Sequence, residues 1–329
     1  MYIYNRYSFM LMRNLIHSFR KLVRDKFYTL INIIGLTFGL TCSTIILIYV
    51  HHELTYDGHH VHADRIYRVA QNFVTSGKPK KFAVTSPALG PALHREYPQI
   101  EAFVRIKPTY HLLVAHEDTE FYEEFAAFAD SNIFSVFSYE FLSGDPLTCL
   151  SDPGSIVISE SLAEKYFGRK DPLGEALLVE NRLPVTVTGV IGDPPSNSHI
   201  TINAFISYLT WENQGISPPS EEWSMFEIHD FTFLIFRKEL DREAFDAGWP
   251  GFFKEYIEED AGLYGQVYEP IFHKLREIHY NSDLPVDFPT GNKSFLYTLM
   301  LIGIAILLLA GINYTNMTTA KALTRIREA

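Results

Sequence analysis

Cysteine is scarce in this 329-residue chain, which contains only Cys42 and Cys149. Cys42 lies within a long apolar segment, whereas Cys149 lies in a polar region, so we expect the two thiols to face different solvents and to form no disulfide. This shortage excludes a small domain held together by disulfides. The polar region must therefore fold around a hydrophobic core of its own, as one domain or two lobes.

Charge is absent from two segments, 29–50 and 295–314. Each is about as long as the 20 residues that a helix needs to cross the hydrocarbon core of a bilayer. We therefore predict a membrane protein with transmembrane helices over 29–50 and 293–320.

Basic residues are scarce between these segments. Residues 51–292 carry 18 Lys and Arg against 37 Asp and Glu, a net charge of −19 in a chain whose total is −11. Residues 1–50 carry six basic residues and one acidic residue, and residues 293–329 carry four and one. Because basic flanks stay in the cytoplasm, we predict that both ends are cytoplasmic and that 51–292 lie outside. The acidic region also excludes nucleic acid as a partner.

The first apolar segment has a second interpretation, a cleaved signal peptide. Signal peptides have shorter apolar regions that end in small residues, and no Ala-x-Ala sequence precedes His51. In the leader, residues 1–28, Leu11, Leu15 and Phe19 recur at four-residue spacing among basic residues. This pattern predicts an amphipathic basic helix on the inner membrane face, with a cytoplasmic extension of the first span as the alternative.

Catalytic signatures are missing. The spacing from Gly168 to Gly174 resembles that of a phosphate loop, but Glu175 stands where the loop needs a lysine. Serine hydroxyls lie beside His199 in a proline-rich turn, where neighbours rarely form a nucleophile and base pair, and no Gly-x-Ser-x-Gly elbow occurs. We predict no catalytic residue, no cofactor and no enzymatic activity.

Five of the chain's 13 histidines follow the first apolar segment closely: His51, His52, His59, His60 and His62. Imidazole is a ligand of zinc and copper, so a metal site is one interpretation. The alternative is a polar stalk at the membrane surface, because no pair has a recognised metal-ligand spacing. Acidic clusters at 120–124 and 255–260 lack the pattern of calcium loops, and we expect solvated surfaces there.

Between the apolar segments, β-forming stretches alternate with helical ones. We predict strands over 65–74, 100–107, 120–129, 155–159, 184–191, 230–238 and 264–273, with another beginning near Ile200. We predict helices over 86–97, 160–167 and 241–260. Ser86 and Pro91 suit the start of the first helix, and Gly168 ends the second. The elements predict a mixed α+β domain with the helices on one side of its sheets.

Several motifs occur in a fixed order along the chain. They include Glu53-Leu54-Thr55-Tyr56-Asp57, Ala63-Asp64-Arg65-Ile66-Tyr67-Arg68-Val69, Lys165-Tyr166-Phe167-Gly168, Asp171-Pro172-Leu173-Gly174, Asp193-Pro194-Pro195-Ser196-Asn197-Ser198-His199 and Ile312-Asn313-Tyr314-Thr315-Asn316. Each is weak alone, but together they span nearly the whole chain. The series resembles the permease subunits of MacB/FtsX-type ABC transporters.

This resemblance implies a periplasmic core domain over 51–292 in the bacterial inner membrane. It implies a porter-like lobe, 51–140 and 205–292, with an inserted sabre-like lobe, 141–204. It also implies that the chain is the N-terminal part of a longer permease, and that 321–329 begin a cytoplasmic segment.

The resemblance further implies partners and a mechanical role. The expected partners are a cytoplasmic ABC ATPase subunit, a second permease copy or internal second half, a periplasmic adaptor and the lipid bilayer. The rival interpretations are a two-span sensor or a scaffold that regulates cell-wall hydrolases. The residues that the motifs assign to packing and coupling are Gly35, Tyr56, Asp57, Arg65, Tyr67, Arg68, Gly168, Gly174, Asp193, Asn197, His199, Asn313 and Asn316.

Overall fold

The structure, a computed structural model, describes residues 26–75, 78–214, 223, 229–263, 266–281, 284, 287 and 290–328. The predicted leader helix over 1–28 lies outside these residues except for its last three. The chain divides into two units. One unit, the domain, is Thr55–Gly291. The other, the helical unit, consists of the segments that precede and follow the domain in sequence, Met1–Leu54 and Asn292–Ala329.

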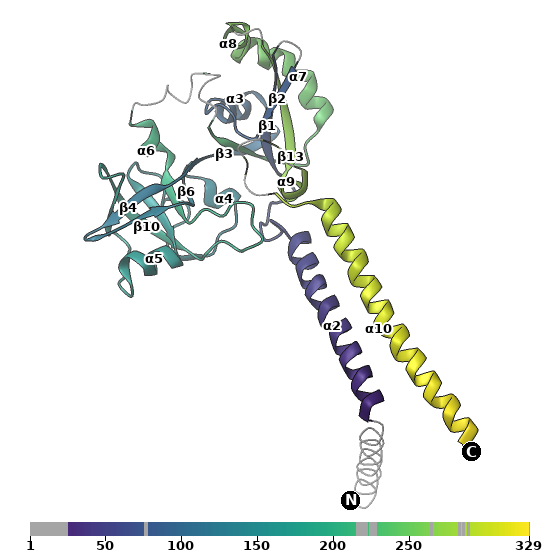
Figure 1. Cartoon of the computed structure of the whole chain (residues 1–329). Coiled ribbons are helices and arrows are strands. Elements are labelled where there is room, and N and C mark those ends of the chain that lie inside the picture. Colours follow the sequence, from purple (N-terminus) through teal and green to yellow (C-terminus); the bar gives the residue numbers. More distant parts are fainter. Residues whose placement is uncertain are drawn as a thin grey trace, which may run out of the picture. The chain divides into compact units, whose positions relative to one another are not determined.

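The helical unit contains two long helices, α2 (Lys26–Leu54) and α10 (Lys293–Glu328), which run side by side (Figure 1). Their apolar parts have mean hydropathies of 2.1 over Thr29–Leu54 and 2.6 over Lys293–Asn316. By length and composition both helices are able to cross a membrane. Each helix extends beyond the predicted span.

Small residues let the two helices approach closely. A Cβ atom at Gly39 would lie 2.7 Å from the Cβ atom of Ala310, and one at Gly303 would lie 3.0 Å from a methyl group of Ile46. The hydroxyl of Ser43 donates a hydrogen bond to the Gly303 carbonyl at 3.2 Å. Close backbone approach at small residues is a common way for helices to associate in lipid.

The domain is built on one mixed sheet. Within the described residues the sheet has 13 strands. The strands are β1 (Ile66–Thr75), β2 (Lys78–Phe82), β3 (Ile100–Thr109), β4 (Leu112–His116), β5 (Thr119–Glu123), β6 (Ala126–Ala129), β7 (Phe141–Gly144), β8 (Ser155–Ser159), β9 (Ala176–Val179), β10 (Leu183–Ile191), β11 (Ala204–Ser207), β12 (Phe231–Phe236) and β13 (Gln266–Lys274).

The strand order is β13-β1-β12-β3-β6-β11-β8-β10-β9-β4-β5, with β2 beside β1 and β7 beside β10. Two neighbouring pairs are parallel, β6 with β11 and β8 with β10, and the other pairs are antiparallel. The four-residue strand β6 pairs on one side with β3 and on the other with β11. It therefore joins the two halves of the sheet.

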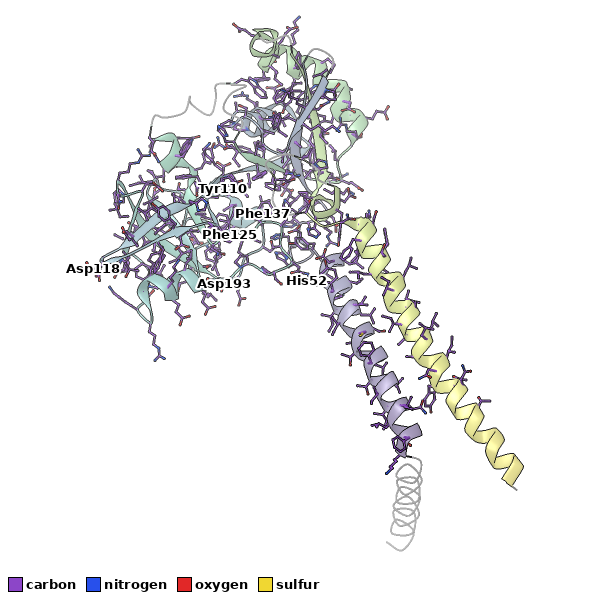
Figure 2. All side chains as sticks on the ribbon, viewed as in Figure 1. His52, Tyr110, Asp118, Phe125, Phe137 and Asp193 are labelled. Atoms are coloured by element: carbon purple, nitrogen blue, oxygen red, sulfur yellow. The ribbon has the colours of Figure 1, made fainter. Side chains whose placement is uncertain are left out.

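The helices of the domain cover both faces of the sheet. They are α3 (Leu89–Glu96), α4 (Ile133–Val136), α5 (Glu160–Phe167), α6 (Tyr208–Glu212), α7 (Arg242–Tyr256), α8 (Glu258–Leu263) and α9 (Leu275–Asn281). Strand β12 shows this arrangement, since Phe233 packs in one core with α4, α9 and Phe137 (Figure 2), and Leu234 packs in another with α3 and α7. The prediction that the helices lie on one side is wrong, because β12 is apolar on both of its faces.

The mixed α+β class is confirmed, with corrections to single elements. The predicted strand 120–129 is two strands, because the chain turns at Glu124 and Phe125. The predicted helix 241–260 breaks at Ile257. Ser86 does not cap α3, which begins after Ala88 without a side-chain cap. Helix α5 forms over the predicted residues and ends at Gly168, whose φ is 61°.

The helix contact gives a first prediction. Gly39→Leu should drive the helices apart, because its side chain would overlap Ala310, and overpacking of this kind costs about 1–3 kcal/mol. Gly311→Leu is the matched control, since a Cβ atom there meets nothing within 4 Å. The thermal unfolding midpoint in detergent should fall for the first variant only. An equal fall in both would contradict the packing argument.

Candidate functional site

A polar cluster joins the first residues of the domain to its last ones. It consists of Asp57, Arg68, Asn197, His199 and Asp287, and we call it the Arg68 cluster. Four of its members were predicted from the motifs, and the structure brings these four together. Asp287 was not predicted, because nothing in the sequence around it marks it. The sequence does contain an indirect signal for a buried acid, because Arg68 lies within an apolar strand and a buried arginine requires an acidic partner.

The centre of the cluster is an ion pair between Arg68 and Asp287. The guanidinium donates to both carboxylate oxygens, at 2.5 and 2.9 Å, and the exposed fractions of the two side chains are 0% and 4%. The ring of His199 lies 3.3 Å from the guanidinium and 3.6 Å from the carboxylate. This forked geometry is the strongest form of ion pair in proteins.

Burial shapes the protonation of these groups. Burial would raise the pKa of Asp287, but the nearby imidazole of His199 and the charge of Arg68 outweigh it, and the pKa lies below its usual range. Burial lowers the pKa of Arg68, against the charge of Asp287, yet an arginine stays protonated in proteins. Burial also lowers the pKa of His199. The pair is therefore ionised, and the histidine beside it is neutral.

Asp57 anchors the start of the domain. Its φ is 54°, in the left-handed region that aspartate tolerates better than most residues. Its carboxylate accepts a hydrogen bond from the His199 backbone N–H at 2.7 Å. The Asp57 N–H donates to the Asn197 carbonyl at 2.9 Å, and the Asn197 amide donates to the Thr55 carbonyl at 3.2 Å. The turn 193–199 is thus tied to the residues that directly follow α2.

The end of the domain is tied to the same place. The rings of Tyr56 and His279 stack with centroids 3.6 Å apart and planes 8° apart. The Gly291 N–H donates to the His279 carbonyl at 2.7 Å, and a Cβ atom at Gly291 would lie 2.5 Å from Nε2 of that histidine. Residue 291 directly precedes the helical unit in sequence. The two chain crossings between units therefore lie on one polar framework within the domain.

The five clustered histidines have different local surroundings, and the rings of His59 and His60 lie together with their centroids 3.9 Å apart. His51 and His52 are in the last turn of α2. His60 is buried, accepts a hydrogen bond from the Ser138 N–H at 3.0 Å, and has a pKa that burial lowers to about 3. His62 lies 3.1 Å from the guanidinium of Arg65. Among the described residues no group of three or more His, Cys, Asp or Glu is placed to hold a metal ion.

The other predicted residues of the domain stabilise local structure. Arg65 donates to Glu101 at 2.7 Å and to the Phe236 carbonyl at 2.9 Å. Tyr67 packs edge-on against Phe236. Asp193 accepts from the Ser161 N–H at the start of α5 at 3.2 Å.

Two of these residues are glycines with a positive φ. Gly168 ends α5, and Gly174, with a φ of 78°, donates to the Val187 carbonyl at 2.8 Å.

In the helical unit the structure brings Gly35 and Asn313 together. A Cβ atom at Gly35 would lie 3.2 Å from the side-chain nitrogen of Asn313. Asn316 is exposed on α10.

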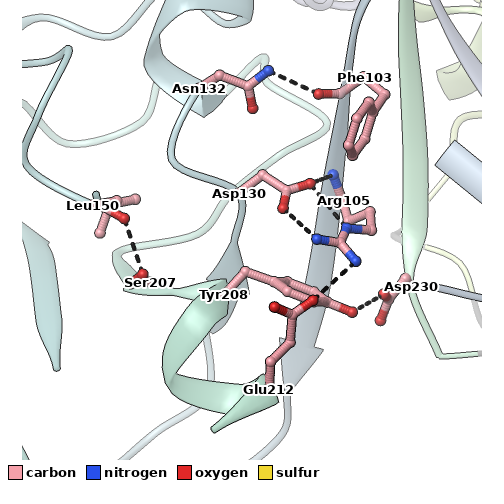
Figure 3. Close-up of polar contacts among 9 residues, drawn as sticks. All are labelled: Phe103, Arg105, Asp130, Asn132, Leu150, Ser207, Tyr208, Glu212 and Asp230. Atoms are coloured by element: carbon pink, nitrogen blue, oxygen red, sulfur yellow. Dashed lines mark hydrogen bonds and ion pairs between the residues drawn. The ribbon is translucent and has the colours of Figure 1, made fainter. Parts of the chain in front are cut away.

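A second polar cluster was not predicted at all. We call it the Arg105 cluster, and its members are Arg105, Lys107, Asp130, Tyr208, Glu212 and Asp230. Figure 3 shows all of them except Lys107. Arg105 donates to Asp130 at 2.7 and 3.1 Å and to Glu212 at 3.3 Å. Its guanidinium lies 3.9 Å from the centre of the Tyr208 ring.

The Arg105 cluster crosses the middle of the sheet. Its basic residues come from β3. Asp130 directly follows β6, Asp230 directly precedes β12, and Tyr208 and Glu212 are in α6. Tyr208 donates a hydrogen bond to Asp230, and Lys107 lies 3.7 Å from that carboxylate. Burial raises the pKa of Asp230 to about 6, against the charge of Lys107. Basic residues at alternate positions of β3 were the missed signal, because they must share one face.

Comparison with known proteins gives the family. The model of the MacB-like periplasmic core domain matches residues 29–246, well over half of the chain. The chain belongs to this family. It is a MacB-like periplasmic domain of the ABC-type permeases, with two apolar helices that flank the domain in sequence. Permeases of this family are components of ABC transporters and are generally not catalytic. No curated protein sequence matches the chain.

Three solved structures are similar to the chain, and the first of them shares its fold. A domain assigned to a permease of Porphyromonas gingivalis has a TM-score of 0.58 and 21% identity, over 73% of this chain and 98% of that one. The periplasmic region of MacB from Actinobacillus actinomycetemcomitans has a TM-score of 0.41 and 12% identity, over 61% and 87%. The extracellular domain of the noncanonic ABC-type transporter YknZ from Gram-positive bacteria has a TM-score of 0.38 and 14% identity, over 61% of this chain and 99% of that one.

The buried ion pair gives a second prediction. Arg68→Gln leaves the Asp287 carboxylate buried without its cation, and removal of one partner of a buried pair costs about 3–5 kcal/mol. Arg242→Gln is the control, because its pair with Asp246 is about half exposed and such pairs contribute less than about 1 kcal/mol. Urea unfolding in detergent measures both. A loss below about 1 kcal/mol for Arg68→Gln would contradict the role of the pair.

The third prediction concerns pH. Burial raises the pKa of Asp57 to about 7, so the protonated carboxyl stabilises the fold fully below pH 4, and this contribution is lost as pH rises to about 7. Asp57→Asn keeps the acceptor oxygen and carries no charge. The variant should match the wild type at pH 4 and unfold at a higher temperature than the wild type at pH 8.

The exposed Asp64→Asn is the matched control for this profile and should follow the wild type at every pH, since its side chain is 77% exposed. Parallel curves for Asp57→Asn and the wild type would show that the Asp57 carboxyl does not titrate in the expected range.

Proposed function

We propose that the chain couples ATP hydrolysis by a separate cytoplasmic ATPase to movement of its periplasmic domain, and that this movement exports or releases a cargo. The observation that carries the proposal is the Arg68 cluster. Its hydrogen bonds and ion pair tie the residues after α2 to those before α10, so that displacement of either helix reaches the same framework. A domain that the two helices only attached to the membrane would not need buried charges where the chain enters and leaves it.

The proposed mechanism has three steps. The ATPase closes on ATP at the cytoplasmic side, and the basic flanks of both helices favour the same side for the two ends of the chain. The helices shift together, because Gly39 and Ala310 hold them in close contact. The shift then reaches the sheet through Thr55 and Tyr56 at one crossing and Gly291 at the other.

The lobes predicted from the sequence form part of this proposal. With the predicted bounds, the porter-like lobe comprises β1 to β6, β12 and β13 with α3, α4 and α6 to α9, and the sabre-like lobe comprises β7 to β10 with α5, while β11 begins at the boundary between them. Strand pairing favours adding β4 and β5 to the sabre-like lobe, because β4 pairs with β9. The expected adaptor and second permease half would meet this domain and the helices.

The fourth prediction tests the coupling. The uninterrupted gene product, expressed in its native host and purified in mild detergent, should retain an ABC ATPase that mass spectrometry identifies. ATP should change the pattern of limited proteolysis of residues 51–292. Gly35→Leu, which crowds Asn313, should keep ATP binding by the partner and lose this change, whereas Gly311→Leu should behave as the wild type.

Two results would count against the proposal. A well-folded, full-length preparation without any ATPase would favour the sensor or the scaffold. An unaltered ATP response in Gly35→Leu would show that the contact between the helices does not transmit movement.

A further inference from the structure

A pocket of about 270 Å³ opens in the domain beside two turns, where the chain leaves β3 and where it passes from β5 to β6. It is lined by Pro108, Thr109, Tyr110, His111, Glu124, Phe125, Ala126, Ile202 and Asp287. Its volume is near the lower end of the range for small-molecule sites, about 300–1,000 Å³. Two of the lining residues belong to groups described above, Asp287 to the Arg68 cluster and Glu124 to the acidic cluster 120–124, and the other lining residues belong to none of them.

The walls of the pocket are held by hydrogen bonds. The hydroxyl of Thr109 donates to the Ala126 carbonyl at 3.0 Å, which fixes the end of β3 against the start of β6. The Phe125 carbonyl accepts from the N–H groups of Asn203 and Ala204 at 2.7 and 3.3 Å. The turns that carry the lining side chains therefore rest on the sheet, and a ligand would meet a site that is already formed.

Two aromatic side chains at the pocket are exposed. The exposed fractions are 67% for Tyr110 and 50% for Phe125, and Figure 2 labels both residues. Aromatic rings offer a large apolar area and a negative face, and at an exposed position the folded chain gains little from either. A pair of exposed rings beside a pocket therefore favours a ligand that covers them.

The charges around the pocket are acidic. Glu124 is exposed and makes no ion pair with any described residue. Asp287 also lines the pocket, but its charge is largely met by Arg68. Residues 51–292 have a net charge of −19, which concentrates cations near the surface of the domain. Glu124 is therefore the carboxylate that would meet a cationic group, beside rings that attract cations through their faces.

We propose that this pocket binds a small organic cation with an apolar body. Its ammonium group lies against Glu124 and the ring of Tyr110, and its apolar part covers the ring of Phe125. That such a cation is the transported cargo rests on the function proposed above. Binding itself does not, because it needs neither the ATPase nor movement of the helices.

Isothermal titration of the full chain tests the proposal, in nanodiscs of zwitterionic phosphatidylcholine so that the lipid does not attract cations. The probe is benzyltrimethylammonium, and the comparators are benzyl alcohol, which is neutral, and benzenesulfonate, which is anionic. Saturable binding of the cation, at least tenfold tighter than either comparator and weakened by salt, is expected. Equal or absent binding of all three would overturn the proposal.

Matched variants locate the site. Tyr110→Ala and Glu124→Gln should each weaken binding of the cation at least threefold. The controls Tyr122→Ala and Glu120→Gln remove an exposed ring and an exposed carboxylate from β5, outside the pocket, and should bind as the wild type does. All four positions are exposed, and equal thermal midpoints verify the fold. Equal weakening by Glu120→Gln would indicate attraction by the overall charge and overturn the pocket as the site.

A failure of this experiment leaves the coupling proposal intact, because ATP-dependent proteolysis does not involve the probe. Conversely, cation binding by a chain that retains no ATPase would support the pocket and contradict the coupling.

Discussion

The buried ion pair of Arg68 and Asp287 is the constraint on which the domain depends. Arg68 is in β1, the strand that pairs with β2, β12 and β13, so its side chain cannot leave the interior without disrupting the sheet. The residue needs a buried carboxylate, and Asp287 supplies it from the last part of the domain. The position of that part, and of the turn that carries His199, is therefore set by the cost of an unpaired charge.

Both polar clusters determine which arrangement the chain adopts more than how stable it is. Apolar side chains of equal size could stabilise the same positions as well or better. Charged groups differ because they require a partner at one distance and one direction. The Arg68 cluster fixes the two chain crossings in this way, and the Arg105 cluster fixes helix α6 against the middle of the sheet. The movement proposed above would need positions defined in this manner.

Local signals carried most of the correct predictions from sequence. The uncharged segments predicted both long helices, and Gly168 correctly predicted the end of α5. Contacts between distant residues were not predictable in this way, since 219 residues separate Arg68 from Asp287. Short strands such as β9 are too brief for a pattern to show. The apolar run of β12 does indicate that both faces of this strand are covered, and this signal outweighs the pattern that favours helices on one side.

Strand β6 is the narrowest part of the sheet. Four small or flat residues, Ala126–Ala129, are the backbone bridge between five strands on one side and seven on the other, since β3 and β11 do not touch directly in the strand order. Each strand of a sheet is twisted relative to its neighbour. Because β6 pairs with β3 on one side and with β11 on the other, its pairing sets the orientation of one half of the described sheet relative to the other.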